Sequence, residues 1–388
     1  MDEIIYLDNG ATSFPKPEEV YVFMDQFYRN FGVNPGRAAY GLSIEAEAVV
    51  SNTRQLLTSV FNGQDPNRLC FSYNSTDALN LIIFGLLQPG DHAISTALDH
   101  NSVLRPLYLL SLQGVEVEYV PFDKNGFIDP DEIKRRFRAN TRLVVVSHAS
   151  NVIGTVQPIA EIGRRCREAG VIFAVDSSQT AGKIPVDMDA QFIDVVAFTG
   201  HKSLLGPTGI GGLYVREGVE IRQTRAGGTG IKSCIRTHPE EYPYRLEYGT
   251  VNTIGIAGLY RGVRWILERG MQNIHEHEMR LTRKLRDGLK EIPGVILYCQ
   301  DDLADHIGVL AFNIQGLEAG KVGKILDSDY GIAVRSGFHC SPLVHKQLDT
   351  VSIGGAVRFG IGPFNTEEQI DTAVKAVAVI ASGKKKSE

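Results

Sequence analysis

One lysine in this sequence, Lys202, is placed where it could carry out covalent chemistry. It closely follows an apolar segment, residues 194–198, that predicts a buried strand. Burial of a lysine is costly and lowers its pKa, and a neutral lysine amine can form a Schiff base with an aldehyde. Taken alone, a surface lysine at the end of a strand explains the residue more simply, so the chemistry depends on what surrounds Lys202.

Several other polar side chains occupy the same kind of position, just beyond a predicted strand. In a mostly parallel sheet with helices on both faces, the polar residues beyond the strand ends gather in one crevice. We therefore expect one shared pocket, lined by Thr76, His100, Asn151, Asp176, Gln179 and Lys202.

The groups in this pocket complement the parts of pyridoxal phosphate. The lysine can hold the aldehyde, Asp176 can pair with a protonated ring nitrogen, and His100 can stack on the ring. A helix start at residues 74–77, Asn-Ser-Thr-Asp, can hold the phosphate. Each group has a plainer explanation, because Asp176 could be a structural cap, His100 a hydrogen-bonded polar residue and the Ser-Thr turn an ordinary helix cap. Four complementary groups on successive strand ends favour the cofactor.

Strands and helices alternate along the first two thirds of the chain, and this alternation positions the pocket. Apolar and β-branched runs predict strands at residues 4–7, 69–73, 92–96, 115–120, 143–147, 171–175, 194–198 and 210–215, the last running back. Helical spacing is found at residues 18–28, 42–61, 78–87, 129–137 and 159–169. The pattern predicts an α/β fold with a mostly parallel sheet and helices on both faces.

The last third of the chain has a different character. Helical spacing at residues 256–268 and on through 289 is followed by short strands at 295–298, 309–314, 332–335 and 356–360, and by a helix near Thr366. This pattern predicts a smaller α+β C-terminal domain. The predicted division is a large cofactor-binding domain at residues 15–255 and a small domain made of residues 1–14 and 256–388.

Composition narrows the class of protein. The chain has 388 residues, 43% of them apolar, and a formal net charge of −5, which allows a sizeable core and argues against a nucleic-acid binder. It shows no early apolar signal region and no apolar run of about 20 residues, so we expect a cytoplasmic protein without a membrane partner. The five cysteines are scattered without a Cys-x-x-Cys pair, so we expect no metal site.

Eight ordered motifs carry a family resemblance over nearly the whole chain. They are YLDNGATS at residues 6–13, NSTDALNL at 74–81, LDHNS at 98–102, SHASNVIGT at 147–155, VDSSQTAG at 175–182, TGHKSLLGPTGIG at 199–211, EYGTVNT at 247–253 and RSGFHC at 335–340. With these motifs the sequence resembles the class V aminotransferase family of fold-type I pyridoxal phosphate enzymes. Within that family it is most similar to the cysteine desulfurases of type II, the group that includes selenocysteine lyases. The resemblance implies a seven-stranded, mostly parallel sheet.

The resemblance also implies roles for individual residues. Catalysis would depend on Lys202, which carries the cofactor, on His100 and on Cys340. Cofactor contacts would come from Ser75, Thr76, His100, Asp176, Gln179, Thr199, His201, Lys202 and Thr250. Of these, Thr250 would reach the phosphate in the neighbouring subunit of a homodimer. Substrate contacts would come from Gly10, Arg37, Asn151 and Arg358.

Cys340 distinguishes one reaction from others in this family. It lies in a polar, loop-forming segment, with Gly337 before it and Pro342 after it, whereas Cys70 and Cys166 fit small buried hydrophobic positions. Mobile, partly exposed cysteines beside cationic groups are the reactive kind. The resemblance implies that Cys340 attacks the sulfur of bound L-cysteine, keeps that sulfur as a persulfide for an acceptor protein or thiol, and lets alanine leave.

Three alternatives remain open at this point. A selenocysteine lyase would use the same pocket, because sulfur and selenium substrates are nearly isosteric. Another class V transaminase or lyase would leave Cys340 incidental. A non-catalytic protein that kept the fold is opposed by the presence of both Lys202 and Asp176, which such a protein would not need.

Overall fold

A seven-stranded sheet forms the centre of the computed structural model, which describes residues 4–36, 40–298 and 300–383. The strand order is β2-β8-β7-β6-β5-β3-β4, and β8 alone runs antiparallel to its neighbours in this sheet. The strands are β2 Leu69–Ser72, β3 His92–Thr96, β4 Glu116–Val120, β5 Thr141–Ser147, β6 Ile172–Asp176, β7 Val195–Thr199 and β8 Gly211–Val215. The predicted mostly parallel sheet, with a last strand that runs back, is confirmed.

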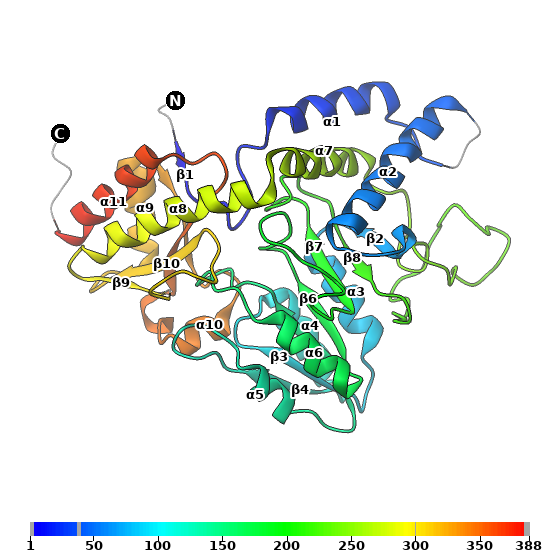
Figure 1. Cartoon of the computed structure of the whole chain (residues 1–388), viewed down its shortest axis with the longest axis horizontal. Coiled ribbons are helices and arrows are strands. Elements are labelled where there is room, and N and C mark those ends of the chain that lie inside the picture. Colours follow the sequence, from blue (N-terminus) through cyan, green and yellow to red (C-terminus); the bar gives the residue numbers. More distant parts are fainter. Residues whose placement is uncertain (1–3, 37–39, 299, 384–388) are drawn as a thin grey trace.

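Helices cover both faces of this sheet because its central strands are apolar on both sides. In β5, Leu143 and Val145 pack in one core with α3 and α4, and Val144 and Val146 pack in the other with α2, α6 and α7. The helices are α1 Glu18–Phe31, α2 Gly41–Val60, α3 Ser75–Leu86, α4 Asn101–Ser111, α5 Pro130–Arg135, α6 Ile159–Ala169 and α7 Thr253–Arg269. Figure 1 shows α1 and α2 beside α7, at one edge of the molecule.

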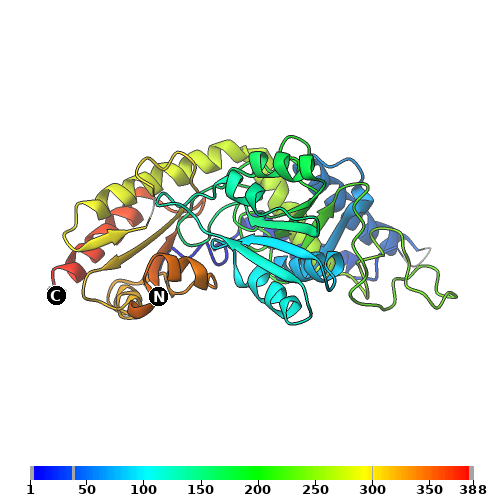
Figure 2. The same cartoon turned by 90° about the horizontal axis from the view of Figure 1, so that it is seen from below.

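The rest of the chain forms a second, smaller layer of sheet and helices. Its antiparallel sheet has the order β12-β13-β10-β9, and β1 pairs in parallel with β11 in a separate two-stranded sheet. The strands are β1 Ile5–Tyr6, β9 Val295–Leu297, β10 Val309–Ile314, β11 Ile332–Ala333, β12 Arg335–Gly337 and β13 Ala356–Gly360, and the helices are α8 Met271–Lys290, α9 Ala319–Tyr330, α10 Pro342–Gln347 and α11 Glu367–Ala381. The long helix α8 follows α7 and runs out along this smaller part (Figures 1 and 2).

Two helices of the smaller part, α9 and α10, are absent from the sequence-based expectation. Gly320 and Gly323 lower the helix propensity of α9, although Ala319, Val322 and Leu326 form a buried stripe at helical spacing. Tertiary packing of that stripe outweighs the local preference. The single strand expected at residues 332–335 is also divided, into β11 and β12, which belong to two different sheets.

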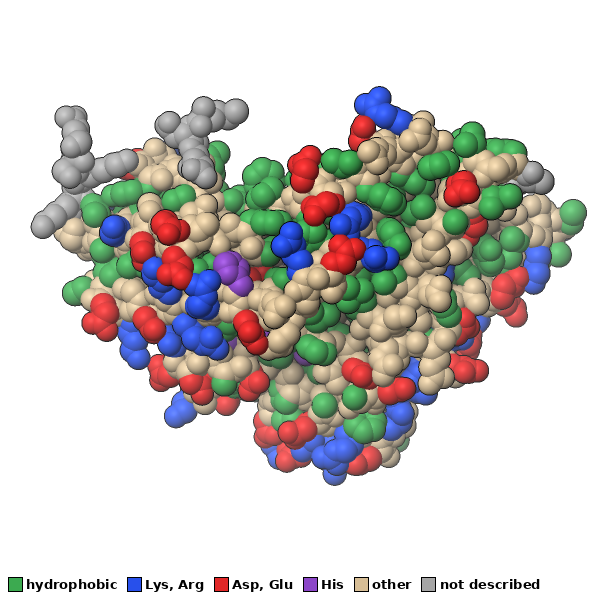
Figure 3. Space-filling view, turned by 45° about the horizontal axis from the view of Figure 1, so that its top comes forward, with side chains coloured by type: hydrophobic (Ala, Val, Ile, Leu, Met, Phe, Trp, Pro, Cys, Tyr) green, Lys and Arg blue, Asp and Glu red, His purple; other side chains and the backbone are tan. Residues whose placement is uncertain are grey.

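The surface carries both signs of charge. On the face shown in Figure 3, acidic and basic side chains are interspersed among apolar ones. Within the described ranges, no helix is long and apolar enough to cross a membrane.

Candidate active site

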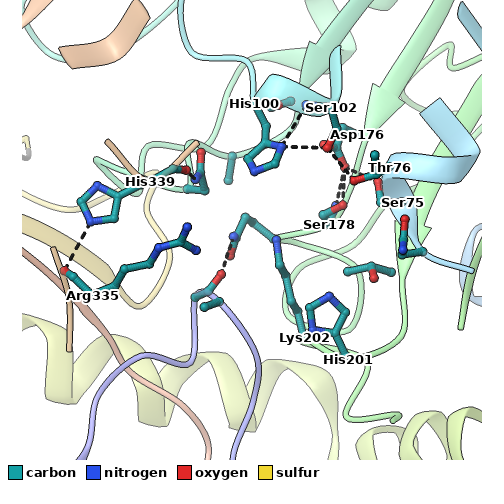
Figure 4. A pocket seen from close by; sticks show the side chains of 18 of the residues that line it. Ser75, Thr76, His100, Ser102, Asp176, Ser178, His201, Lys202, Arg335 and His339 are labelled. Carbon is teal, nitrogen blue, oxygen red and sulfur yellow. Dashed lines mark hydrogen bonds between the residues drawn. The ribbon is translucent and has the colours of Figure 1, made fainter. Parts of the chain in front are cut away.

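A cavity of about 260 Å³ lies where the ends of the sheet strands meet the smaller part of the chain. It brings together most of the residues predicted for the site: Gly10, Ser75, Thr76, His100, Asn151, Asp176, Gln179, Thr199, His201, Lys202 and Arg358. The expectation that six residues beyond the strand ends share one pocket is therefore confirmed. In Figure 4 the side chains of Arg335 and His339 face Asp176, Ser75 and Thr76 across this cavity.

Lys202 follows β7, and the N-terminal segment holds its backbone. The hydroxyl of Ser13 donates to the Lys202 carbonyl at 2.9 Å, and the Ser13 N–H and the Thr12 hydroxyl each donate to the His201 carbonyl at 3.0 Å. Burial lowers the pKa of Lys202 to about 8, although the charge of Asp176 opposes this shift. A lysine with this pKa has a substantial neutral fraction near pH 8, as aldehyde chemistry requires.

Asp176 is the last residue of β6, and one of its two carboxylate oxygens accepts hydrogen bonds from neighbouring residues. Its Oδ1 accepts hydrogen bonds from the Ser75 hydroxyl at 3.2 Å and from the Ser178 N–H at 3.0 Å. Its Oδ2 receives no hydrogen bond from the part of the chain that the structure describes. The residue is 7% exposed and lines the cavity. A carboxylate so placed can accept a hydrogen bond from a protonated ring nitrogen.

His100 caps α4, and this contact fixes its tautomer. The Ser102 N–H donates to His100 Nδ1 at 3.1 Å, and a backbone N–H can only donate. Burial, together with the charge of Lys202, lowers the pKa of His100 to about 4. At neutral pH the ring is therefore uncharged and carries its proton on Nε2, so His100 can offer a hydrogen-bond donor.

One end of the cavity is lined by donors that lack partners. α3 begins at Ser75, and the N–H groups of Ser75 and Thr76 find no acceptor among the described residues, as expected for a first helical turn. Thr199 Oγ1 and His201 Nδ1 are also buried there without a hydrogen-bond partner in the described chain. An unsatisfied buried polar atom costs about 1–3 kcal/mol. These groups, at a helix N-terminus, suit an anion such as phosphate.

The opposite side of the cavity contains the buried guanidinium of Arg358, on β13. Its Nη2 donates to Asp8 Oδ1 at 2.7 Å, and its Nη1 donates to the Asn151 carbonyl at 2.9 Å. Its Nε is buried without a partner among the described residues, and the side chain is 1% exposed. Gly10 allows this position, since a Cβ at residue 10 would lie 3.2 Å from Arg358 Cζ. Donors remain free for a carboxylate.

Cys340 lies in the turn between β12 and α10 and is next to His339, which lines this cavity. The Nη2 of Arg335 donates to Cys340 Sγ at 3.4 Å. Cys340 is half-buried, which agrees with the predicted partial exposure, and a cationic group lies beside it as expected. Its neighbours Arg335 and His339 both line the cavity.

The fold and this geometry can be compared with those of known proteins. The family model described as aminotransferase class-V matches residues 5–373. A probable cysteine desulfurase of Methanothermobacter thermautotrophicus is 34% identical over 382 residues, which cover 97% of this chain and 94% of that protein. The chain belongs to the class V aminotransferase family.

Other relatives of this class V protein agree with that assignment. A cysteine desulfurase of Escherichia coli O157:H7 is 32% identical over 382 residues, covering 96% of this chain and 92% of that protein. The apo structure of a cysteine desulfurase from Thermococcus onnurineus NA1 superposes with a TM-score of 0.91 at 32% identity, covering 98% of this chain and 96% of that one. Membership of the family implies dependence on pyridoxal phosphate, and the unpartnered donors around Thr199 and His201 fit its phosphate.

Two predicted residues that the structure describes, Thr250 and Cys340, are not among those that line the cavity. Thr250 lines a separate pocket with Tyr73 and Val251, so its predicted contact with a neighbouring subunit stays a prediction. Arg37 lies outside the described residues. The described residues include no cluster of three or more His, Cys, Asp or Glu side chains that could hold a metal ion.

Four further residues that the structure places here have no role predicted from the sequence. Ser102 and Ser178 bind His100 and Asp176, and Arg335 and His339 line the cavity beside Cys340. All four lie within the motifs LDHNS, VDSSQTAG and RSGFHC. The motifs therefore contained the signal, but the partner of each side chain is visible only in the fold.

Proposed function

We propose that this protein is a pyridoxal phosphate-dependent cysteine desulfurase, which converts L-cysteine to L-alanine and keeps the sulfur as a persulfide on Cys340. One observation supports this proposal above the others. Cys340 Sγ lies beside the guanidinium of Arg335, a residue that lines the same cavity as Lys202 and Asp176. The full-length similarity to cysteine desulfurases points to the same activity.

The cofactor would be held by the sheet side of the cavity. The α3 N-terminus, Thr199 and His201 would bind its phosphate, and Asp176 Oδ2 would accept a hydrogen bond from its ring nitrogen and keep that nitrogen protonated. Bound pyridoxal phosphate supplies an electron sink for amino-acid chemistry. Lys202 Nζ, with a pKa of about 8, would take the proton from the substrate α-carbon and return it later.

The substrate would be oriented from the other side. Arg358 has free donors in a buried position, where a guanidinium binds a carboxylate with two parallel hydrogen bonds. Asn151 and Gly10 lie beside it in the cavity. The amino acid would thus be fixed by its carboxylate at the small part of the chain, with its α-carbon directed toward Lys202.

The sulfur step would be carried out by Cys340. Its thiolate would attack the sulfur of the bound substrate, so that an S–S bond forms as the substrate Cβ–S bond breaks. The bonding pair would stay with the substrate skeleton, which gains a proton at Cβ and leaves as alanine. Arg335 would compensate negative charge on sulfur before attack and on the persulfide afterwards.

We further propose that two copies of the chain assemble and that the persulfide passes to an external acceptor protein or thiol. Thr250 supports a homodimer, because it lines a pocket other than the active-site cavity of its own chain. The division into a large domain at 15–255 and a small domain at 1–14 and 256–388 is part of this proposal, as is a cytoplasmic location. The pairing of β1 with β11 supports grouping residues 1–14 with the C-terminal part.

The proposal is tested by steady-state turnover of L-cysteine with reductant, following alanine and sulfide, in the wild type and in Cys340→Ala. We expect the wild type to form both products in equal amounts and Cys340→Ala to lose at least about 100-fold of this activity. Cys166→Ala is the control, because Cys166 is buried on α6 away from the cavity. Undiminished turnover by Cys340→Ala would disprove the persulfide role. Selenocysteine turnover that survives in Cys340→Ala would favour a selenocysteine lyase.

A further inference from the structure

The backbone around Cys340 adopts a conformation that its own residues do not favour. His339 and Cys340 have φ angles of 49° and 58°, in the left-handed region that residues other than glycine rarely occupy. Such backbone persists only where surrounding contacts determine it. Two sets of buried contacts do so here.

The first set of contacts holds residues 339–341 through the side-chain amide of Asn151 and the backbone of Asn101. The Nδ2 of Asn151 donates to the His339 carbonyl at 2.7 Å, and its Oδ1 accepts from the Ser341 hydroxyl at 2.8 Å. The Asn101 N–H donates to the Cys340 carbonyl at 2.7 Å. Asn151 is 8% exposed and Ser341 is fully buried, so water does not compete strongly for these hydrogen bonds.

The second set runs through two imidazole rings. His339 Nε2 lies 3.3 Å from the Arg335 carbonyl oxygen, a contact that Figure 4 shows, and His339 Nδ1 lies 3.3 Å from His345 Nε2. His345 Nδ1 lies 2.8 Å from Thr350 Oγ1. None of the three side chains His339, His345 and Thr350 is more than 2% exposed.

The Arg335 carbonyl sets the direction of each hydrogen bond in the series that runs from it through His339 and His345 to Thr350. A carbonyl oxygen only accepts, so His339 carries its proton on Nε2 and accepts on Nδ1. His345 must then donate from Nε2, and its Nδ1 accepts from the Thr350 hydroxyl, because that contact is shorter (2.8 Å) than the one from the same hydroxyl to the His345 carbonyl (3.4 Å). Burial lowers the pKa of His339 to about 2 and that of His345 to about 4, so both rings are neutral at neutral pH and this one arrangement persists.

We propose that His339, His345 and Thr350 are positioning residues that hold Cys340 Sγ against the guanidinium of Arg335, a residue that lines the cavity. The ring of His339 binds the carbonyl of Arg335, and the guanidinium of the same arginine donates to Cys340 Sγ. These hydrogen bonds thereby hold Arg335 and Cys340 in contact with each other. The inference rests on the proposed persulfide role of Cys340, and it extends the sulfur-transfer site to a threonine remote from the substrate.

The sharpest test removes only the hydroxyl at the end of the chain. Thr350→Val leaves His345 Nδ1 without a donor, so the tautomer of His345 that donates from Nε2 to His339 is no longer favoured. Thr350→Ser keeps the hydroxyl. We would measure the rate at which iodoacetamide alkylates Cys340 at pH 7, by mass spectrometry of the peptide that contains it. Thr350→Val should slow this alkylation by about 5-fold, since a sulfur away from Arg335 is a weaker nucleophile, and Thr350→Ser should restore the wild-type rate.

The kinetic constants separate positioning from substrate binding. We expect Thr350→Val to lower kcat for L-cysteine by about 5-fold and to leave KM within about 2-fold, because attack by Cys340 follows binding. Cofactor absorption and the melting temperature show whether the variant is folded. An unchanged or faster alkylation of Cys340 in folded Thr350→Val would overturn the inference.

A second variant tests the other set of contacts. Ser341→Ala removes the donor to Asn151 Oδ1 and, like Thr350→Val, should slow the alkylation of Cys340. It therefore tests whether buried contacts position Cys340 even if Thr350→Val does not fold. Failure of both variants to fold would mean that these residues stabilise the fold as a whole, which would overturn the positioning role. The alkylation comparison does not depend on turnover, so the two proposals can fail separately. Absence of alanine formation by the wild type would disprove the proposed function and leave the alkylation result unaffected.

Discussion

The two sides of the active-site cavity are built in different ways. On the sheet side, Asp176 and Lys202 stand at the ends of the consecutive strands β6 and β7, and Ser75 begins a helix that follows β2. On the other side, Arg358 is held by Asp8, and Cys340 is flanked by contacts to Asn151. The first side is assembled by local strand-to-helix geometry, and the second by contacts between segments far apart in the chain.

This difference coincides with a difference in charge balance. The sheet side leaves several polar groups without partners, namely Asp176 Oδ2, Thr199 Oγ1 and His201 Nδ1, as far as the described residues show. On the other side, Arg358 Nε also lacks a partner among the described residues, but the guanidinium already has a carboxylate partner, Asp8, 2.7 Å away. The sheet side therefore favours one permanently bound group, whereas the other side is suited to a substrate that binds and leaves.

The largest effect should come from removing the reactive group on the sheet side. We expect Lys202→Ala to lower cysteine turnover by at least about 10³-fold, because it removes a general acid–base group, and to abolish the visible absorption of the bound cofactor. In the wild-type apoprotein, uptake of pyridoxal phosphate should become faster as pH rises and level off above about 8. Only the neutral amine reacts, and burial lowers the pKa of Lys202 to about 8.

The control for this prediction is a lysine outside the reaction. Lys183 is also buried, but it pairs with Glu278 at 2.7 Å, so Lys183→Met should keep the visible band in whatever fraction of the protein folds. A Lys202→Ala variant that still shows the band would contradict the assignment of the sheet side as the cofactor side.

A change on the other side should affect substrate binding and leave the cofactor in place. Arg358→Lys keeps the positive charge but loses the two parallel donors that match a carboxylate. We expect kcat/KM for L-cysteine to fall by about 100-fold, mostly through KM, with the visible band retained. Loss of the band in this variant would show that the two sides are not separable.

The same division explains what could be predicted from the sequence. Asp176, His100 and Lys202 were predictable because parallel strands place their carboxyl ends at one edge of the sheet, so position along the chain gives position in space. The contact between Asp8 and Arg358 could not be predicted in this way. It depends on how the N-terminal strand β1 packs beside β11, and no local pattern specifies that pairing.

The segment around Cys340 shows the limit more clearly. Its motif identified the cysteine, and its polar and glycine content predicted a loop, which the structure confirms as a turn at residues 338–341 between β12 and α10. The order around Cys340 comes from His345 and Asn151, which lie outside that motif. Hydrogen bonds from buried side chains outside the motif therefore determine the conformation that the motif alone does not specify.

The smallest predicted effect concerns the charge that opposes Arg358. Asp8→Asn keeps an oxygen that can accept from Arg358 Nη2 but removes the negative charge, so the substrate carboxylate no longer meets repulsion from Asp8. A partly exposed charge of this kind is worth about 0.2–1 kcal/mol, and the side chain of Asp8 is 20% exposed. We therefore expect Asp8→Asn to lower KM for L-cysteine by about 3-fold and to leave kcat nearly unchanged.

Asp8→Ala separates charge from orientation. It removes the charge and also the acceptor, so the guanidinium loses one of its two anchors, and KM should rise because Arg358 is no longer held in place for the carboxylate. If KM falls in Asp8→Asn and rises in Asp8→Ala, Asp8 both orients Arg358 and weakens the binding of the substrate carboxylate by Arg358. A site that must release its product requires such a balance. A KM that rises in both variants would assign Asp8 to orientation alone.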